Sequence, residues 1–313
     1  DVSALTLPTT SGTISVANVN DAPTVGTPPM ADQTATEDSA FEFTIGSDAF
    51  ADIDGEALAY TATLSGGGEL PAWLSFDGET RTFSGTPANG DVGPVDVTVT
   101  VTDGEGETVS DTFTLNVSNV NDAPVVSIAQ GVKAATEDAA FEYVVPAETF
   151  ADVDADDTLT YSATLSGGGE LPAWLSFDAA TRTFSGTPAN GDVAEIEVTV
   201  TATDSEAATV SDTFTLTVAN TNDAPVVNVA QSPQSATEDA MFEYVMPAET
   251  FADVDLDDTL NYTVTLSGGD PLPDWLSFNA ATRTFSGTPG NDDVGDVSVT
   301  VTATDGEGET VSN

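Results

Sequence analysis

The stretch Val95-Asp96-Val97-Thr98-Val99-Thr100-Val101 alternates apolar and polar side chains at every step. Successive side chains of a β-strand point to opposite faces of its sheet, so this alternation predicts a strand with one face on a core and the other in water. The same period of two is present in three further stretches, which are residues 41–45, 58–64 and 113–117. These four stretches predict half-buried strands of an antiparallel sheet.

Turn-forming residues separate the predicted strands, and no long segment has helical periodicity. The turn signals include Gly66-Gly67-Gly68, Asp77-Gly78, Pro87-Ala88-Asn89-Gly90 and Asp103-Gly104. About seven short strands in about 100 residues are typical of an immunoglobulin-like sandwich of two sheets. The predicted fold class is therefore all-β, with immunoglobulin-like Greek-key β-sandwiches.

The sequence repeats itself with a step of 101 residues. Asn20-Asp21-Ala22-Pro23 recurs at residues 121–124 and 222–225, and the stretches 70–76 and 81–87 recur in the same register. A fixed period of this length indicates copies of one domain. We expect repeat 1 at residues 20–120, repeat 2 at residues 121–221 and repeat 3 at residues 222–313. Residues 1–19 then supply the terminal strand of a preceding or donated repeat.

The two ends of the sequence are out of phase with the repeat. Residues 12–19 resemble a last strand with no domain before it, and repeat 3 stops where its own last strand would begin. One interpretation is an excerpt from a longer tandem array. The other is strand donation, in which residues 10–19 complete repeat 3 of a neighbouring copy and so cover an open sheet edge.

The composition restricts the possible partners. Only 4 Lys and Arg residues oppose 53 Asp and Glu residues, which gives a net charge of −49. Nucleic acid and anionic membranes would be repelled, whereas cations would be attracted. The chain has no Cys and no His, so a metal site must be built from oxygen ligands, which favours Ca2+ or Mg2+. No apolar stretch is long enough to insert into a membrane.

Many of the carboxylates and linker amides recur in register with the repeat. Ca2+ takes six to eight oxygen ligands, which two domains and the linker between them can supply together. Acidic residues placed only for solubility would have no reason to recur in step. We therefore predict calcium sites at the boundaries between repeats. The predicted ligands are Asn20, Asp21, Glu37, Asp38, Asp52, Asp54, Asp91, Asp103, Asn119, Asn121, Asp122, Glu137, Asp138, Asp152, Asp154, Asp192, Asp204, Asn220, Asn222, Asp223, Asp253, Asp255 and Asp305.

This set of residues resembles the calcium-binding pattern of the cadherin family. The linker Asn119-Val120-Asn121-Asp122-Ala123-Pro124 looks like the cadherin Asp-x-Asn-Asp-Asn-x-Pro linker, although it is one residue shorter and begins with Asn. Asp152-x-Asp154 matches the Asp-x-Asp motif, and Asp204 matches the late carboxylate of the following domain. Glu37 or Asp38 matches the early Glu. Asp91 lies where an Asp-Arg-Glu motif would begin, but Val92 and Gly93 follow it, so this chain departs from the family there.

A closer resemblance is to the bacterial cadherin-like domains of the dystroglycan type, also described as immunoglobulin-like. Their motifs Asn-Asp-Ala-Pro, Phe-x-Asp-x-Asp, Leu-Pro-x-Trp-Leu-x-Phe and Phe-x-Gly-Thr-Pro are present in all three copies and cover about residues 20–313. The resemblance implies an all-β fold of tandem immunoglobulin/cadherin-like Greek-key β-sandwiches arranged as an extended rod. It also implies a secreted tandem-repeat region of a large surface adhesin, extracellular or at the cell surface. Its expected partners are calcium, neighbouring repeats or copies of the same chain, and an extracellular polysaccharide or cell-surface ligand.

Other functional classes fit the sequence less well. Trp73, Trp174 and Trp275 could stack on sugars in a carbohydrate-binding module, but a Trp at one fixed place in a sandwich is more often part of the core. Arg81, Arg182 and Arg283 are expected to anchor a local carboxylate or carbonyl, and each Gly-Thr-Pro is expected to form a turn. Three acidic sets at domain edges do not suit one catalytic cleft, so we expect no enzyme. A filament subunit joined by strand donation remains an alternative.

Overall fold

The computed structural model describes residues 15–154, 157–255 and 258–313. The chain divides into two compact units. The first contains Asp1–Ala123 and Asp152–Thr158, and the second contains Pro124–Ala151 and Leu159–Asn313. No helix in the described part of the chain is long and apolar enough to cross a membrane.

The elements of the first unit are short strands and one 3₁₀ turn. They are β1 (Thr24–Val25), β2 (Gln33–Thr36), β3 (Phe41–Thr44), β4 (Phe50–Ala51), β5 (Ala59–Leu64), β6 (Leu74–Asp77), β7 (Thr82–Gly85), η1 (Asn89–Asp91), β8 (Gly93–Thr102) and β9 (Thr108–Ser118).

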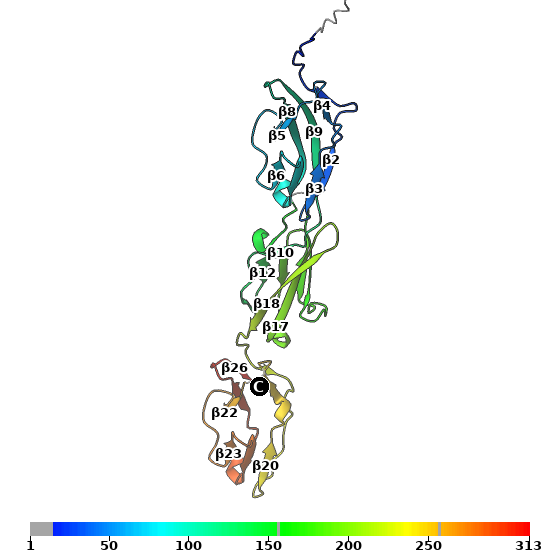
Figure 1. Ribbon diagram of the computed structural model, residues 1–313. Coiled ribbons are helices and arrows are strands. Elements are labelled where there is room, and N and C mark those ends of the chain that lie inside the picture. The colour runs from blue at the N-terminus through cyan, green and yellow to red at the C-terminus, as the bar shows by residue number, and fades with distance from the viewer. Residues whose placement is uncertain (1–14, 155–156, 256–257) are drawn as a thin grey trace, which may run out of the picture. The chain divides into compact units, whose positions relative to one another are not determined.

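Two main sheets form the first unit. One has the order β2-β9-β8-β5 and the other the order β3-β7-β6, while β1 pairs separately with β4. Figure 1 shows β8 and β9 as the long strands of the larger sheet. All pairs are antiparallel except β2 with β9, which run parallel. The final strand of the repeat is therefore held on one side by its hairpin partner and on the other by β2.

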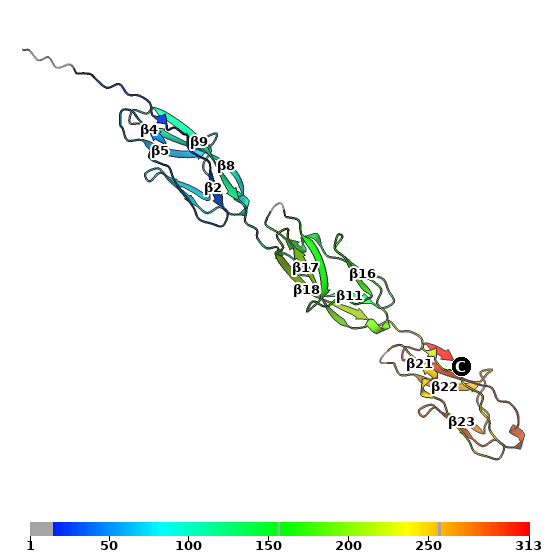
Figure 2. The ribbon, with the colours of Figure 1, turned by 90° about the vertical axis from the view of Figure 1, so that its right-hand side faces the viewer.

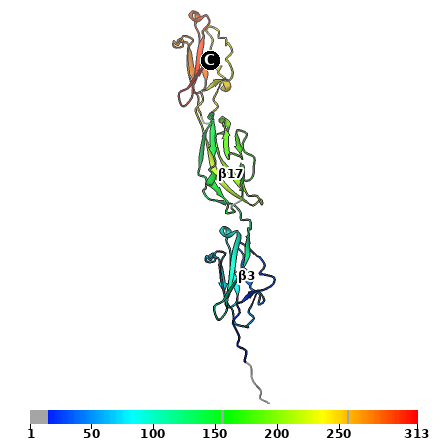
Figure 3. The same cartoon turned by 90° about the horizontal axis from the view of Figure 1, so that it is seen from above.

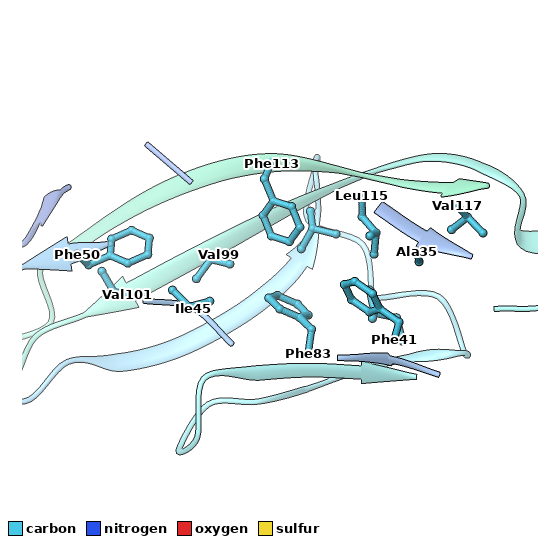
Figure 4. Packing of buried hydrophobic residues seen from close by; sticks show 12 residues of the cluster. Ala35, Phe41, Ile45, Phe50, Phe83, Val99, Val101, Phe113, Leu115 and Val117 are labelled. Carbon is cyan, nitrogen blue, oxygen red and sulfur yellow. The ribbon is translucent and has the colours of Figure 1, made fainter. Parts of the chain in front are cut away.

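The core lies between the two sheets and follows the alternation of the sequence. Val97, Val99 and Val101 of β8 are fully buried, while the Thr residues between them are partly exposed. Figure 4 shows Phe83 from the smaller sheet facing Phe113 from the larger one, and their ring centroids lie 5.6 Å apart. The period of two therefore predicted both the strand and its buried face correctly.

The second unit is also built of strands and 3₁₀ turns. Its elements are β10 (Val125–Val126), β11 (Lys133–Thr136), β12 (Phe141–Val144), η2 (Ala147–Thr149), β13 (Phe150–Ala151), β14 (Thr160–Leu165), β15 (Leu175–Asp178), β16 (Thr183–Gly186), η3 (Asn190–Asp192), β17 (Glu195–Thr203), β18 (Thr209–Ala219), β19 (Val226–Val227), β20 (Phe242–Val245), η4 (Ala248–Thr250), β21 (Phe251–Ala252), β22 (Asn261–Leu266), β23 (Leu276–Asn279), β24 (Thr284–Gly287), η5 (Asn291–Asp293), β25 (Val299–Thr304) and β26 (Thr310–Ser312).

The second unit contains two hydrophobic cores. The strands of repeat 2 form sheets of order β11-β18-β17-β14 and β12-β16-β15, and β11 and β18 again run parallel. Figures 2 and 3 show β17 within this unit, and Figure 2 also shows β18, which pairs with both β17 and β11. The strands of repeat 3 form sheets of order β20-β24-β23 and β22-β25-β26 around a separate core. The prediction of tandem all-β sandwiches is confirmed.

The three Trp residues have the same position in their sandwiches. Trp73, Trp174 and Trp275 are partly buried and pack on the cores of their repeats. Trp73 makes an edge-to-face contact with Phe41, with ring centroids 6.4 Å apart. These side chains act as core residues, as expected, and are not exposed platforms for sugars.

Repeat 3 differs from the other two at one sheet edge. Residues 234–237 correspond to β11 but form no strand, and they are exposed. In repeat 2, β11 pairs with Leu216–Ala219 of the final strand. Among the described residues, the segment 234–237 of repeat 3 forms no such pair.

The segment considered for strand donation is only partly described. Residues 10–14 lie outside the described residues, and residues 15–19 form no strand. The side chains of Val16 and Val19 are exposed.

Candidate metal centre

The candidate ligands of repeat 1 lie at the end of β2, in the linker after β9 and in the turn after β4. Glu37 follows the end of β2, and Asp122 lies in the linker that continues from β9. Asp52 and Asp54 follow the short strand β4, where the Asp54 amide donates to Asp52 Oδ1 at 2.8 Å. This local bond folds the Asp-x-Asp motif into a turn, so neither carboxylate is confined to a sheet face.

Glu37 is tied to the final strand by its backbone and its side chain. Its amide extends the parallel pairing by donating to Ser118 O at 3.1 Å. Its Oε1 accepts the Val120 amide of the linker at 2.5 Å. The side chain is fully buried, and Oε2 has no hydrogen-bond partner.

The first candidate centre combines Glu37, Asp122 and Asp154, one carboxylate oxygen of each lying within 4.8 Å of the others. The Asp122 amide donates to Asp154 Oδ2 at 2.8 Å. The Asn89 amide, in η1, donates to Asp122 Oδ2 at 2.5 Å. The linker Asp thus lies between a carboxylate of repeat 1 and the first Asp-x-Asp motif of repeat 2.

A second centre of the same design lies in the second unit. It combines Glu137, Asp223 and Asp255, again with oxygens within 4.8 Å of one another. Glu137 Oε1 accepts the Thr221 amide at 2.6 Å, and Asp255 Oδ2 accepts the Asp223 amide at 2.8 Å. Asn190 donates to Asp223, as Asn89 does to Asp122. The recurrence in sequence is therefore also a recurrence in geometry.

The Asp-x-Asp turns of repeats 2 and 3 also contribute to a second acidic group nearby. Asp152, Asp154 and Asp157 form one such group, and Asp253, Asp258 and Asp305 form another. Asp154 belongs to both groups at its boundary, so two neighbouring cation positions would share its carboxylate.

Asp305 is fixed in place by its own loop. Its Oδ1 accepts the amides of Glu307, Gly308 and Glu309 at 2.6 to 3.0 Å, and its Oδ2 accepts Asn222 Nδ2 at 3.1 Å. Burial alone would raise the pKa of Asp305, but the hydrogen bonds from Asn222 and from these amides lower it overall. The carboxylate is thereby kept charged, as a metal ligand must be.

The neighbours of Asp305 show the opposite shift. Burial, together with the charges of Asp253 and Asp305, raises the pKa of Asp258. The charge of Asp258, followed by burial, raises the pKa of Glu307. These shifts record a concentration of negative charge that no cationic side chain among the described residues relieves.

Several carboxylate oxygens in these groups are buried and make no hydrogen bond. They are Glu37 Oε2, Asp152 Oδ2, Asp154 Oδ1, Glu137 Oε2, Asp253 Oδ2, Asp255 Oδ1 and Asp258 Oδ2. Two carboxylates about 5 Å apart repel by about 3 kcal/mol at an effective dielectric constant of about 20. A buried charge without a partner is costly, so this donor set fits a bound cation.

A related set lies at the start of repeat 1. Asn20 Nδ2 donates to Asp103 Oδ2 at 3.0 Å, and the Asp21 amide donates to Asp54 Oδ2 at 2.7 Å. The bond from Asn20, helped by backbone amides against the effect of burial, lowers the pKa of Asp103. A hydrogen bond and repulsion from Glu56 raise the pKa of Glu105.

Some predicted ligands lie elsewhere. Asp38 and Asp138 are exposed in turns with a positive φ of 55°, so Glu37 and Glu137 are the members of each pair that enter the acidic groups. Asn119 and Asn220 are exposed.

Two further predicted ligands are occupied within their own turns. Asp91 Oδ2 accepts the Ala88 amide, and Asp192 Oδ2 accepts the Ala189 amide, both at 3.0 Å.

The remaining predicted ligands are a late carboxylate and two linker amides. Asp204 is buried, and its Oδ1 accepts the Ala208 amide at 2.7 Å. Asn121 and Asn222 are half-buried in their linkers.

Three sets of residues near these centres were not predicted. They are Glu56, Asp157 and Asp258 beyond the Asp-x-Asp turns, Glu105, Glu206 and Glu307 in the following loops, and Asn89, Asn190 and Asn291 in the 3₁₀ turns. All three sets recur every 101 residues, so the register contained the signal. The Asp-x-Asp motif itself recurs after 100 residues between repeats 1 and 2, because repeat 1 is one residue shorter after that motif.

The family described as Putative Ig domain matches residues 22–118, 123–219 and 224–313. The chain belongs to this family. Curated relatives include the serine-rich adhesin for platelets of Staphylococcus aureus strain USA300, which is 30% identical over 48% of this chain and 6% of its own length. The same adhesin of strain MRSA252 is 28% identical over 56% of this chain and 12% of its own length. The chain thus spans a small part of these relatives.

Solved structures of cadherin ectodomains share the fold. Mouse cadherin-23 EC22-24 aligns over 94% of this chain and 97% of its own, with a TM-score of 0.62 and 17% identity. Human CDH23 EC21-23 aligns over 90% and 96%, with a TM-score of 0.56 and 18% identity. The predicted resemblance to bacterial cadherin-like and immunoglobulin-like adhesin repeats is confirmed.

Proposed function

We propose that this chain is an extracellular structural and adhesive repeat region, and that Ca2+ bound at the boundaries between its repeats limits their relative motion. The matched relatives are named as adhesins for platelets, which supports a role outside the cell. The chain would act as the stalk or spacer that carries an adhesive surface away from the cell.

The observation that carries this proposal is the set of buried carboxylate oxygens without partners. Glu37 Oε2 and Asp154 Oδ1 come from different repeats, and Asp122 of the linker lies between them. A fold gains nothing from burying unpaired carboxylates of two domains side by side unless a cation compensates them. The same arrangement at Glu137, Asp223 and Asp255 makes a local accident improbable.

The chemistry of the donors favours Ca2+ over other metals. The chain offers carboxylate, amide and backbone oxygens and has neither His nor Cys, and Ca2+ accepts many such ligands in flexible geometry. Extracellular modules bind Ca2+ with Kd values of about 10⁻⁴ to 10⁻³ M. Extracellular calcium would therefore fill these sites, and a chelator would empty them.

The chain's own residues determine what a cation would do at a boundary. Without it, the carboxylates of consecutive repeats repel one another across the linker. With it, Glu37, Asp122 and Asp154 would all contact one positive charge, so the hinge would lose freedom. The Pro that follows each linker Asp further restricts the backbone there.

Calorimetric titration of the whole chain with Ca2+ tests the site. Glu37→Gln removes one charge from the first centre while keeping the size of the side chain, and it should weaken binding at that boundary by at least about tenfold, or about 1.4 kcal/mol. Glu42→Gln is the matched control, because Glu42 is an exposed residue of β3 in the same repeat. Equal titration curves for wild type and Glu37→Gln would contradict the proposal.

A further inference from the structure

The 3₁₀ turns beside the two centres contain a reactive sequence that the proposed calcium role does not use. Repeats 1 and 2 have Asn89-Gly90 and Asn190-Gly191, whereas repeat 3 has Asn291-Asp292 at the same place. Asn89 and Asn190 are half-buried and donate to the linker residues Asp122 and Asp223. Each Asn-Gly pair therefore lies directly against a linker.

The fold has no evident need for Gly at these two positions. A Cβ atom placed on Gly90 or Gly191 would meet no atom within 4 Å, and neither residue has the positive φ that favours Gly. Repeat 3 forms the same 3₁₀ turn with Asp292 in this position. Helical turns are weakened by Gly, so its presence calls for a reason outside packing.

We propose that Asn89 and Asn190 are sites of spontaneous deamidation. The backbone nitrogen of the following Gly attacks the side-chain Cγ of Asn and loses its proton, the new N–Cγ bond replaces the Cγ–NH2 bond, and ammonia leaves. Water then opens the resulting succinimide to Asp or isoaspartate. No oxidant or reductant is needed.

Two features of the turns favour this reaction. Gly has no Cβ to obstruct the approach of its nitrogen to Cγ, and it is the residue with the most conformational freedom. Gly90 and Gly191 are also exposed, and among the turn and loop hydrogen bonds of the described residues none comes from either backbone amide, so the attacking nitrogen is held by none of those acceptors. Asp292 in repeat 3 lacks the first feature.

The modification would change the linker contact. The Asn89 amide is a donor to Asp122 Oδ2 at 2.5 Å. A carboxylate in its place cannot donate when ionised, and it adds a fourth negative charge to Glu37, Asp122 and Asp154. Deamidation therefore releases the linker from η1 in the absence of a cation. If the proposed calcium role is correct, the modified boundary also depends more strongly on Ca2+.

Peptide mapping by mass spectrometry tests the modification independently of calcium binding. The whole chain is incubated at mildly alkaline pH in EGTA, and the exchange of NH2 for OH is followed at each 3₁₀ turn. Asn89 and Asn190 should convert while Asn291 stays intact. In Gly90→Ala, conversion at residue 89 should slow at least tenfold, with Asn190 in the same molecule as the internal standard. The proposal is overturned if Asn291 converts as fast, or if Asn89 and Asn190 persist while a synthetic peptide of residues 86–93 converts.

Hydrogen exchange of Asn89→Asp tests the effect on the linker. In EGTA, the amides of Val120 and Asp122 should exchange several-fold faster than in wild type, while those of β8 stay unchanged. Equal exchange at the linker would overturn the claim that deamidation releases it. Neither readout involves bound Ca2+, so failure of the calcium proposal would remain distinguishable.

Discussion

At the scale of single residues, a close approach between two backbone segments explains why Gly85 lies next to Trp73. Each Phe-x-Gly-Thr-Pro motif was expected to place Gly in a turn, but Gly85 ends strand β7 and pairs with both Phe41 and Leu74. A Cβ on Gly85 would lie well under 3.0 Å from the Trp73 carbonyl oxygen. The Gly and Trp motifs are thus two parts of one packing contact.

Replacing Gly85 therefore tests this packing. Gly85→Ala should reduce the free energy of unfolding of its repeat by about 1–3 kcal/mol, because the backbone of Trp73 must move. Gly90→Ala is the matched control, since nothing lies near its added methyl group. Chemical denaturation followed by tryptophan fluorescence would measure both. Equal stabilities for the two variants would show that the Trp73 carbonyl does not require Gly.

The choice between Glu37 and Asp38 also required the structure. Both recur with the repeat, and either could have matched the early acidic residue of cadherins. The parallel pairing of β2 with β9 ends at Thr36 and Ser118, which buries the next side chain, Glu37, and turns Asp38 outward. The pairing of strands distant in the sequence therefore determines which of the two acidic residues is buried, and the local sequence pattern does not reveal it.

At the scale of strands, the alternating pattern predicted β3, β5, β8 and β9, but it did not reveal the two-residue strands. The stretch from Val95 to Val101 lies inside β8, and the stretch from Phe113 to Val117 lies inside β9. The two-residue strands β1 and β4 have no period to detect, yet they position the Asp-x-Asp turn. The sequence therefore predicts the core strands better than it predicts the short strands β1 and β4 that position the candidate site.

The link between Glu37 and the final strand predicts that calcium stabilises that strand. Because Glu37 contacts both Ser118 and Val120, a cation on its carboxylate should hold β9 against β2. Hydrogen exchange of Gln33–Thr36 and Leu115–Ser118 should slow several-fold on adding Ca2+, with little change in β5. Residues 234–237, which form no strand, provide the internal comparison and should exchange quickly in both conditions. Unchanged protection of β2 and β9 would disprove the link.

At the scale of the whole molecule, charge dominates the expected behaviour. Ion binding at the boundaries would leave most of the net charge of −49 in place, so the chain should stay soluble with or without calcium. The amino-acid composition alone predicts this solubility, and the absence of Cys and His predicts oxygen ligands for a metal. The composition does not indicate which of the many carboxylates are buried together, since that depends on the pairing of distant strands.

The pKa shifts predict a pH optimum for the calcium-free chain. The pKa values of Glu105, Asp258 and Glu307 are raised by neighbouring carboxylates and burial. Their protonation should therefore increase stability as the pH falls from neutrality through these raised values. The pKa values of Asp103 and Asp305 are lowered, so the stability they provide should be lost below the ordinary Asp value of 3.8.

Thermal unfolding in EGTA across this pH range would measure the optimum. The melting temperature should rise from pH 7 towards mild acidity and fall in strong acid, and saturating Ca2+ should remove the rise by compensating the same charges. A melting temperature that only declines on acidification would contradict this account.

Small-angle X-ray scattering of the whole chain, in Ca2+ and then in EGTA, tests the central claim most directly. If calcium at the boundaries limits the motion of the repeats, the particle should be longer and stiffer in Ca2+, and EGTA should shorten its mean dimensions and broaden their distribution. Glu37→Gln combined with Glu137→Gln should scatter in Ca2+ as the wild type does in EGTA. Identical dimensions of the wild type in Ca2+ and EGTA would contradict the account.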